Sequence, residues 1–141
     1  MIIRKAEKKD TKYIRSLLEQ LGCLTEEGFV EDKLDLVMNH PDQTLLVYES
    51  DKNVIAFISL HFVPQIELSG DLAIITYFAV DQIARSEGIG KKMESYCTSL
   101  SKERKCNRIE VHCGIRRVGA HLFYERQGYK EIRKYFRKKL D

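Results

Sequence analysis

Runs of alternating or uninterrupted apolar residues mark several segments of the chain as β-strands. Residues 44–50 (TLLVYES) and 53–63 are two such runs, and the polar residues at 51–53 that join them are typical of a turn, so this part of the chain predicts a hairpin. Residues 72–80 (LAIITYFAV) are almost continuously apolar. Such a run is expected of a central strand that is covered on both faces.

Shorter segments complete the predicted strands. Residues 2–6 and 108–113 each have the apolar spacing of a short strand. Residues 129–140 are rich in charge, and we expect them to form a final strand that pairs with a neighbour.

Apolar residues three and four positions apart predict four helices. The first begins after Asp10, which can cap its N-terminus, and ends at Gly22. The other three span about 26–38, 88–104 and 118–127. The first helix is expected to bury Ile14, Leu17, Leu18 and Leu21, and the third is expected to bury Ile89, Met93, Tyr96, Cys97 and Leu100.

The order of these elements predicts the fold class. Strand, helix, helix, three strands, helix, strand, helix and strand together indicate an α/β protein with three layers. The chain has 141 residues, of which 43% are hydrophobic and 32% are charged, so its composition is that of a soluble globular protein. A chain of this length fits one domain, residues 1–141.

Charge and cysteine content narrow the classes of partner. The 24 Lys and Arg residues against 21 Asp and Glu residues give a net charge of +3, which does not indicate nucleic acid. The N-terminus, MIIRKAEKKD, lacks the apolar core of a signal peptide, and no stretch approaches the roughly 20 apolar residues of a membrane span. We therefore expect a cytoplasmic protein that binds neither nucleic acid nor membrane. Four cysteines without a CxxC pair predict reduced thiols and no metal site.

The stretch ARSEGIGKKM at 84–93 is the first candidate for chemistry. It joins the predicted central strand to a helix, so the unpaired N–H groups of the first helical turn and the positive end of the helix dipole meet there. Gly88 and Gly90 allow an anion to approach the main chain, and a loop around a phosphate can require positive φ. Arg85, Lys91 and Lys92 add positive charge. These features favour a phosphate site.

Two motifs in this order resemble the GCN5-related N-acetyltransferase (GNAT) superfamily over essentially the full chain. The string at 85–90 (RSEGIG), directly after Phe78-Ala79-Val80-Asp81, resembles the Arg/Gln-x-x-Gly-x-Gly/Ala loop that holds the pyrophosphate of acetyl-coenzyme A. Residues 120–132 (AHLFYERQGYKEI) resemble the Ala-x-x-x-Tyr-x-x-x-Gly-Phe/Tyr signature of the family. In that signature the tyrosine, here Tyr124, lies beside the thioester, and Gly128-Tyr129 closes the helix.

The resemblance implies a fold and a set of cofactor contacts. The expected fold is a central mixed, mostly antiparallel sheet of about six to seven strands, with helices on both faces and strands splayed at the cofactor cleft. The expected co-substrate is acetyl-CoA. The implied cofactor-binding residues are Phe78, Ala79, Val80, Arg85, Ser86, Glu87, Gly88, Ile89, Gly90, Lys91, Arg117 and Tyr124.

The family's reaction also implies catalytic roles. An amine attacks the thioester, so the site must accept a proton, stabilise the developing oxyanion and protonate the departing thiolate. The resemblance implies that backbone groups at 78–80 serve the oxyanion. Tyr124 is our candidate for the acid, because a phenol with a pKa near 10 can protonate a thiolate with a pKa of about 8.5 to 10.

Two departures from the family pattern leave roles open. The family often carries a Glu in the central strand, whereas residues 74–77 read IITY and contain no carboxylate. Glu67 and His112 are our candidates for the general base, and Asp71 and Glu110 are alternatives. Arg117 stands where family members commonly have an Asn that contacts the pantetheine arm. An arginine there can reach a phosphate or an anionic acceptor, or it can remain solvated.

Three functions remain open at this stage. The first is transfer of an acetyl group from acetyl-CoA to a small primary amine by direct attack in a ternary complex; the second is acetylation of a protein or peptide; the third is a non-catalytic acyl-CoA-binding module. The C-terminal half and the ISLHF strand are similar to the aminoalkylphosphonate N-acetyltransferase branch. Arginine suits phosphonate and carboxylate groups, so His61, Arg116, Arg117 and His121 are candidates for an acceptor pocket. By analogy with the family, a homodimer through the C-terminal strand is also expected.

Overall fold

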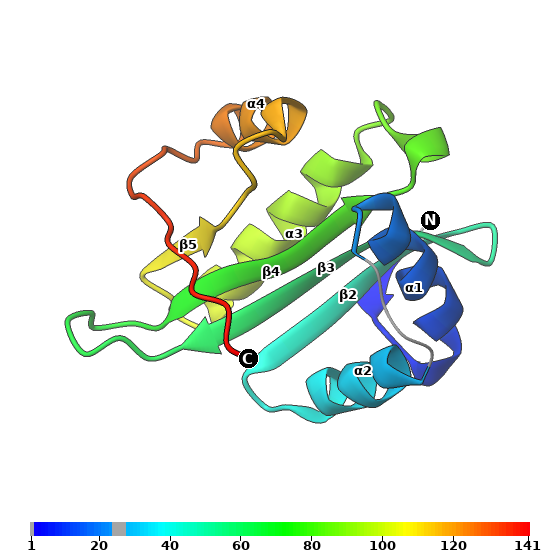
Figure 1. Ribbon diagram of the computed structural model, residues 1–141, viewed down its shortest axis with the longest axis horizontal. Coiled ribbons are helices and arrows are strands. Elements are labelled where there is room, and N and C mark those ends of the chain that lie inside the picture. Colours follow the sequence, from blue (N-terminus) through cyan, green and yellow to red (C-terminus); the bar gives the residue numbers. More distant parts are fainter. Residues whose placement is uncertain (1, 24–27) are drawn as a thin grey trace. The chain divides into compact units, whose positions relative to one another are not determined.

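The computed structural model describes residues 2–23 and 28–141 and divides into two compact units, residues 1–110 and 111–141. Five strands, four α-helices and two 3-10 turns make up the regular structure of the described residues (Figure 1). The strands are β1 (Ile2–Lys5), β2 (Gln43–Ser50), β3 (Asn53–Val63), β4 (Leu72–Val80) and β5 (Arg108–Val111). The helices are α1 (Thr11–Gln20), α2 (Phe29–Asn39), α3 (Ile89–Glu103) and α4 (Val118–Arg126), and the 3-10 turns are η1 (Lys8–Asp10) and η2 (Gln82–Ala84).

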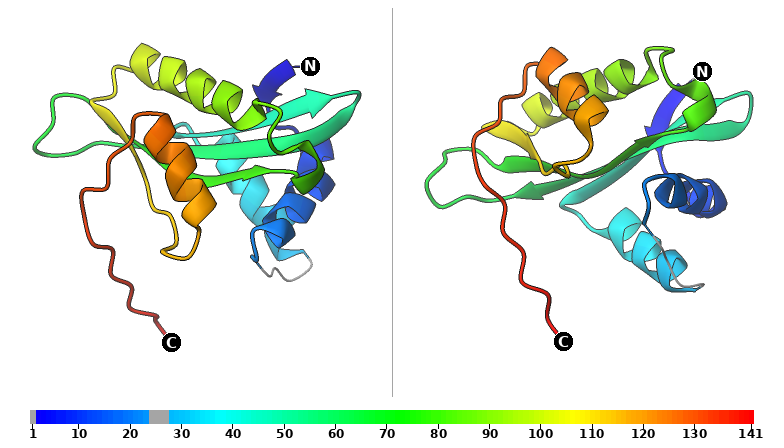
Figure 2. Two further views of the ribbon diagram at one scale, coloured as in Figure 1. Left: turned by 90° about the horizontal axis from the view of Figure 1, so that it is seen from above. Right: turned by 45° about the horizontal axis from the view of Figure 1, so that its top comes forward.

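The strands form one open mixed sheet in the order β1-β2-β3-β4-β5. The first three pairings along this order are antiparallel. Helices α1 and α2 cover one face of the sheet and α3 covers the other, which gives the predicted three layers (Figure 2). The α/β fold class is thus confirmed, but the strand count is five among the described residues and not six to seven.

The hairpin between β2 and β3 forms as predicted, with a shorter turn. Only Asp51 and Lys52 lie between the strands, and Ser50 already pairs with Asn53. Both turn residues have positive φ, 51° and 66°. This is the pattern of a two-residue turn whose twist matches that of the flanking strands.

Helix α1 confirms its predicted apolar stripe and its predicted end. Leu17 and Leu18 are buried, and Gly22 follows the helix at a φ of 85°. The Gly22 N–H donates to the Glu19 carbonyl (2.9 Å) and the Cys23 N–H to the Leu18 carbonyl (3.0 Å). These two bonds are the Schellman arrangement, which requires a left-handed residue such as glycine after the helix.

The predicted role of Asp10 as a helix cap is wrong, because its side chain has a stronger partner. Asp10 stands directly before α1, but its carboxylate forms no capping bond to the helix. It instead accepts two hydrogen bonds from the Arg4 guanidinium (2.8 and 2.9 Å) and one from the Glu7 N–H (2.7 Å). Arg4 also donates to Glu49 (2.8 Å). The network ties β1, η1 and β2 together.

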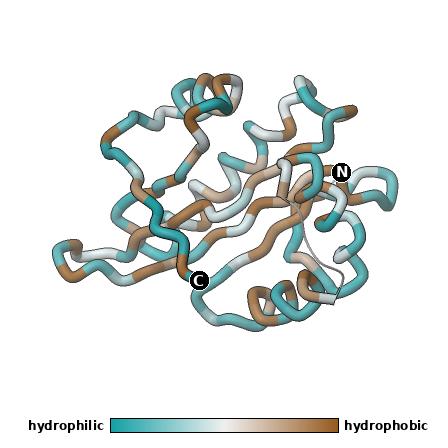
Figure 3. The backbone as a smooth tube through the Cα atoms, viewed as in Figure 1, coloured by the Kyte–Doolittle hydropathy of each residue, from teal (hydrophilic) through white to brown (hydrophobic). Residues whose placement is uncertain are grey.

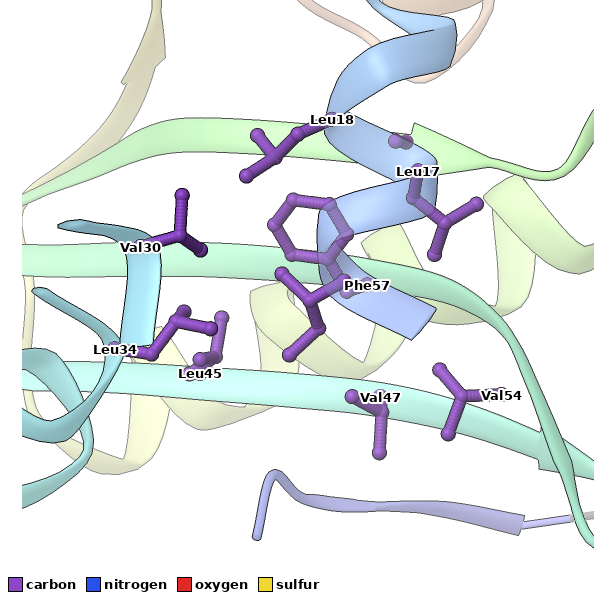
Figure 4. Close-up of a cluster of buried hydrophobic side chains, with 10 residues drawn as sticks. Leu17, Leu18, Val30, Leu34, Leu45, Val47, Val54 and Phe57 are labelled. Atoms are coloured by element: carbon purple, nitrogen blue, oxygen red, sulfur yellow. The ribbon is translucent and has the colours of Figure 1, made fainter. Parts of the chain in front are cut away.

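The main core lies between the sheet and helices α1 and α2. Figure 4 shows Leu17 and Leu18 of α1, Val30 of α2 and Phe57 of β3 directed toward one another. Figure 3 shows hydrophobic residues along the strands that carry this core and on α2. Helix α2 begins at Phe29; residues 26–27 of its predicted span lie outside the described residues.

The predicted stripe of α3 is partly wrong. Ile89, Met93 and Cys97 are buried as expected, but Tyr96 is 43% exposed, and Leu100 is only partly buried. The helix instead buries Glu94 and Ser101. Successive residues of an α-helix are rotated by about 100° around its axis. The buried face is centred on Cys97, so Tyr96 lies about 100° away from the direction of the sheet.

The predicted C-terminal strand is also wrong. Residues 129–141 contain no helix or strand, and the predicted strand at 108–113 ends at Val111. Ile132, Tyr135, Phe136 and Leu140 are at least 61% exposed. In a strand, Ile132, Phe136 and Leu140 would share one face with Lys134 and Lys138, so that face would not be continuously apolar. The strand that we expected to carry a dimer interface is therefore not formed.

Candidate active site

A bulge interrupts β4 near its middle. Tyr77 pairs with Ser59 and Ile75 with Leu60, so Thr76 has no partner residue on β3. The Thr76 hydroxyl donates to the Ser59 carbonyl (3.1 Å). Because an extra residue reverses the alternation of faces, Ile75 is buried while Thr76 and Tyr77 are exposed. The prediction that β4 is covered on both faces is therefore wrong at these two positions.

The register of β4 decides which of its backbone groups face its other edge. The Asp81 N–H donates to the Ile55 carbonyl (2.8 Å). In an antiparallel ladder the hydrogen-bonded pairs alternate with non-bonded pairs, so Ala79, two residues before Asp81, exchanges hydrogen bonds with Phe57 of β3. The N–H and C=O groups of Phe78 and Val80 consequently point away from β3. Of the three residues predicted to serve an oxyanion, Ala79 directs its backbone groups into the sheet.

The turn after β4 is held by three side chains. The Asp81 carboxylate accepts from the Ile83 N–H (3.1 Å), and the Gln20 side-chain oxygen accepts from the Gln82 N–H (2.9 Å). The Arg85 guanidinium Nε donates back to the Val80 carbonyl (3.2 Å). Together these bonds fix η2 to the end of β4 and to the last residue of α1.

The backbone N–H groups of residues 86–91 differ from those before them. Within the described part of the chain, they donate to no protein acceptor, whereas the Ala84 and Arg85 N–H groups bond to Asp81 and Gln82. Ser86 and Gly88 have positive φ, 71° and 79°. A run of amides with such left-handed residues, at the start of a 15-residue helix, is an arrangement that binds anions. The predicted need for positive φ holds at Gly88, while the positive φ of Ser86 had no signal in the sequence.

The side chains around this loop are mostly exposed and mixed in charge. Arg85, Lys91 and Lys92 are exposed cations, and Glu87 is an exposed anion among them. Ile89 is buried and anchors the start of α3. We call residues 86–91 the anion loop.

Glu67, a candidate base, is exposed in the turn between β3 and β4. It therefore lies at the opposite end of β4 from the anion loop. The nine residues of β4 span about 30 Å at roughly 3.3 Å per residue. Asp71, at the start of β4, accepts at its carbonyl from the Asn107 N–H (2.8 Å), and Glu110 lies on β5.

The second unit contains the predicted tyrosine motif. Tyr124 is buried in α4, and its ring packs edge to face on Phe123 (5.3 Å between ring centroids) and Tyr129 (5.4 Å). Gly128 has a φ of 94°, and the Tyr129 N–H donates to the Tyr124 carbonyl (3.0 Å). The motif thus closes the helix as predicted.

The remaining predicted residues of the second unit are exposed or partly buried. His112 is exposed, and its ring stacks on Tyr135 at 4.3 Å. Arg116 and Arg117 are exposed directly before α4. His121 Nε2 donates to the Gly114 carbonyl (2.7 Å), which ties the first turn of α4 to the preceding loop. His61 belongs to the first unit, on β3, where its ring meets His40 edge to face.

Across residues 2–23 and 28–141, no group of three or more His, Cys, Asp or Glu side chains could hold a metal ion. None of the helices in that same part is both long enough and apolar enough for a membrane span.

Comparison with known proteins relates this geometry to a family. The sequence model of the acetyltransferase (GNAT) family matches residues 12–129. A chloroplastic GCN5-related N-acetyltransferase of Arabidopsis thaliana is 31% identical over 62 residues, which are 44% of this chain and only 21% of that protein.

Solved structures share the fold at low identity. A transcriptional regulator from Bacillus halodurans has a TM-score of 0.91 at 20% identity, over 99% of both chains. A glucosamine-6-phosphate N-acetyltransferase from Arabidopsis thaliana has a TM-score of 0.85 at 22% identity, over 99% of this chain and 98% of that one. The family match spans both motifs and most of the sequence, and the chain belongs to the GNAT family of acetyltransferases.

Proposed function

We propose that the chain is a single N-acetyltransferase domain that transfers the acetyl group of acetyl-CoA to a small primary amine by direct attack in a ternary complex. The observation that carries the proposal is the set of unpaired amides at 86–91, at the start of α3, in a chain of the GNAT family. Unpaired amides of this kind fit a diphosphate, because each can donate to an anionic oxygen.

The anion loop binds and orients the co-substrate. Its amides and the exposed Lys91 hold the diphosphate, and the arm that carries the thioester follows the edge of β4. There the Val80 N–H points away from β3, so it can stabilise negative charge on the thioester oxygen without reorganisation. The thioester supplies an activated acetyl group to the amine.

Proton transfer requires an acid and a base. The resemblance implies that Tyr124 lies beside the thioester, and we assign to it the role of the acid that returns a proton to the departing sulfur. The general base takes a proton from the attacking ammonium. His112 and Glu67 remain the candidates, and a water molecule can link a more distant carboxylate to the amine.

One structural neighbour favours a small amine as acceptor. A structural neighbour is an N-acetyltransferase of glucosamine 6-phosphate, which is a small amine that carries an anionic group. The similarity to the aminoalkylphosphonate branch points to the same chemistry. Exposed Arg116 and Arg117 are suited to such an anion.

One observation favours a second candidate, a regulatory module that binds acyl-CoA without catalysis. The bulge residue of β4 is Thr76, not a carboxylate, and its hydroxyl is bonded to the Ser59 carbonyl. Measurement of thiol release separates the two candidates. With acetyl-CoA and a panel of aminoalkylphosphonates, amino sugars and lysine peptides, the transferase releases coenzyme A with at least one small amine. Calorimetric CoA binding without turnover on any amine would favour the module.

A further inference from the structure

Gln20 lies far in sequence from the anion loop, yet its side chain holds the turn that leads into it. The Gln20 oxygen accepts from the Gln82 N–H at 2.9 Å, across 62 residues. Gln82 is the first residue of η2, where a backbone N–H has no partner within the turn itself. The Gln20 oxygen therefore satisfies a backbone N–H that has no acceptor within its own turn.

The turn has little else to hold it. Its side chains are exposed except that of Ala84, and Ile83 is 89% exposed. A three-residue 3-10 turn with so little buried surface has low stability of its own. Its conformation consequently depends on hydrogen bonds from neighbouring elements.

Gln20 is itself on a rigid support. Leu17 and Leu18, in the turn of α1 before it, are buried in the core, and the Schellman bonds at Gly22 close the helix directly after it. The backbone that carries this acceptor is therefore held in place by the core.

We propose that Gln20 is a positioning residue that preorganises residues 86–91 for the diphosphate, an inference that rests on the proposed function. The amides of 83–85 are satisfied by groups of the protein, and those of 86–91 are free for a ligand. The bonded segment 83–85 thus fixes the backbone position at which the unpaired amides of 86–91 begin. Without the Gln20 bond, the Gln82 N–H is solvated by water, and the entrance to the loop must be ordered when the ligand binds.

Gln20→Met tests this, because methionine has similar length and helix propensity but no oxygen acceptor. Glu19→Met is the matched control, since Glu19 is exposed on the same turn and its side chain forms no hydrogen bond among the described residues. Calorimetry with CoA is expected to show a three- to tenfold higher Kd for Gln20→Met, about 0.7–1.4 kcal/mol. Glu19→Met should bind as wild type does, and both variants should have the thermal midpoint of the wild type within a few degrees.

Kinetics with two donors separate positioning from a general structural role. Acetyl-CoA carries the diphosphate, and S-acetylpantetheine lacks it. Gln20→Met should raise the KM for acetyl-CoA, leave kcat unchanged and leave kcat/KM for S-acetylpantetheine unchanged. Equal CoA affinity of Gln20→Met and wild type, or equal losses with both donors, overturns the inference alone. A wild-type chain that binds no CoA overturns the proposed function and this inference together.

Discussion

Replacement of Gly88 by alanine tests the anion loop through a single methyl group. Gly88 has a φ of 79° and a ψ of 8°, and an added Cβ would meet no atom within 4 Å. The folded state therefore suffers only the conformational penalty of a left-handed alanine, about 1–2 kcal/mol. At this chain length, that penalty lowers the thermal midpoint by about 3–8 °C.

The effect on ligand binding should be larger than the effect on stability. A hydrogen bond to a charged group contributes about 1.5–3 kcal/mol, and a methyl group beside the amides keeps a phosphate oxygen away from at least one of them. We therefore expect Gly88→Ala to bind CoA about 10- to 100-fold more weakly. Calorimetry at a temperature well below the midpoint measures this directly.

Gly28→Ala is the matched control. Gly28 also has a positive φ, 86°, and open space around its Cβ position, but it precedes α2. Gly28 has a ψ of −33°, outside the left-handed helical region, so Gly28→Ala should lose at least as much stability as Gly88→Ala, and only Gly88→Ala should lose CoA affinity. If Gly88→Ala binds CoA no more weakly than Gly28→Ala does, the main-chain account of the loop is refuted.

Three further predictions concern other parts of the chain. Tyr124→Phe should lower kcat for acetyl-CoA more than it changes KM; full turnover in steady-state assays would exclude Tyr124 as the acid. Burial raises the pKa of Asp10, but its hydrogen bonds from Arg4 and Glu7 outweigh this and hold the pKa below 3.8. The stability that Asp10 contributes is thus present above pH 3.8 and is lost as the pH falls toward the depressed value. Asp10→Asn should lower the free energy of unfolding, measured in urea at pH 7, by about 2–4 kcal/mol. The difference from the wild type should shrink below pH 3.8. An equal difference at both pH values would contradict the pairing of Asp10 with Arg4. Burial, with the Glu94 charge, raises the pKa of Cys97 to about 12, so iodoacetamide should label it only after unfolding, as read by mass spectrometry.

Local patterns in the sequence were sufficient for the elements whose causes are local. The hairpin and β4 follow from apolar runs and a polar turn, and the ends of α1 and α4 follow from Gly22 and Gly128, which supply left-handed residues where a helix must stop. The positive φ of Gly88 could be expected from the sequence, because glycine adopts this conformation without steric cost, but that of Ser86 could not.

Features that depend on distant partners could not be predicted in this way. Asp10 is a good cap by type, but Arg4 and Glu7 bind its carboxylate in the fold. The bulge at Thr76 arises from pairing with β3, and the bond from Gln82 to Gln20 spans 62 residues, so neither leaves a local signal. The strand predicted at the C-terminal segment failed for a local reason. A strand was expected in this charge-rich segment although neither of its faces would be continuously apolar.

The most direct test of the anion loop is an NMR titration of the labelled protein with CoA, followed at each backbone amide. The account predicts that the largest shift changes fall on the N–H groups of residues 86–91, which have no acceptor among the described residues. CoA binding that leaves those amides unshifted, while others move, would contradict it.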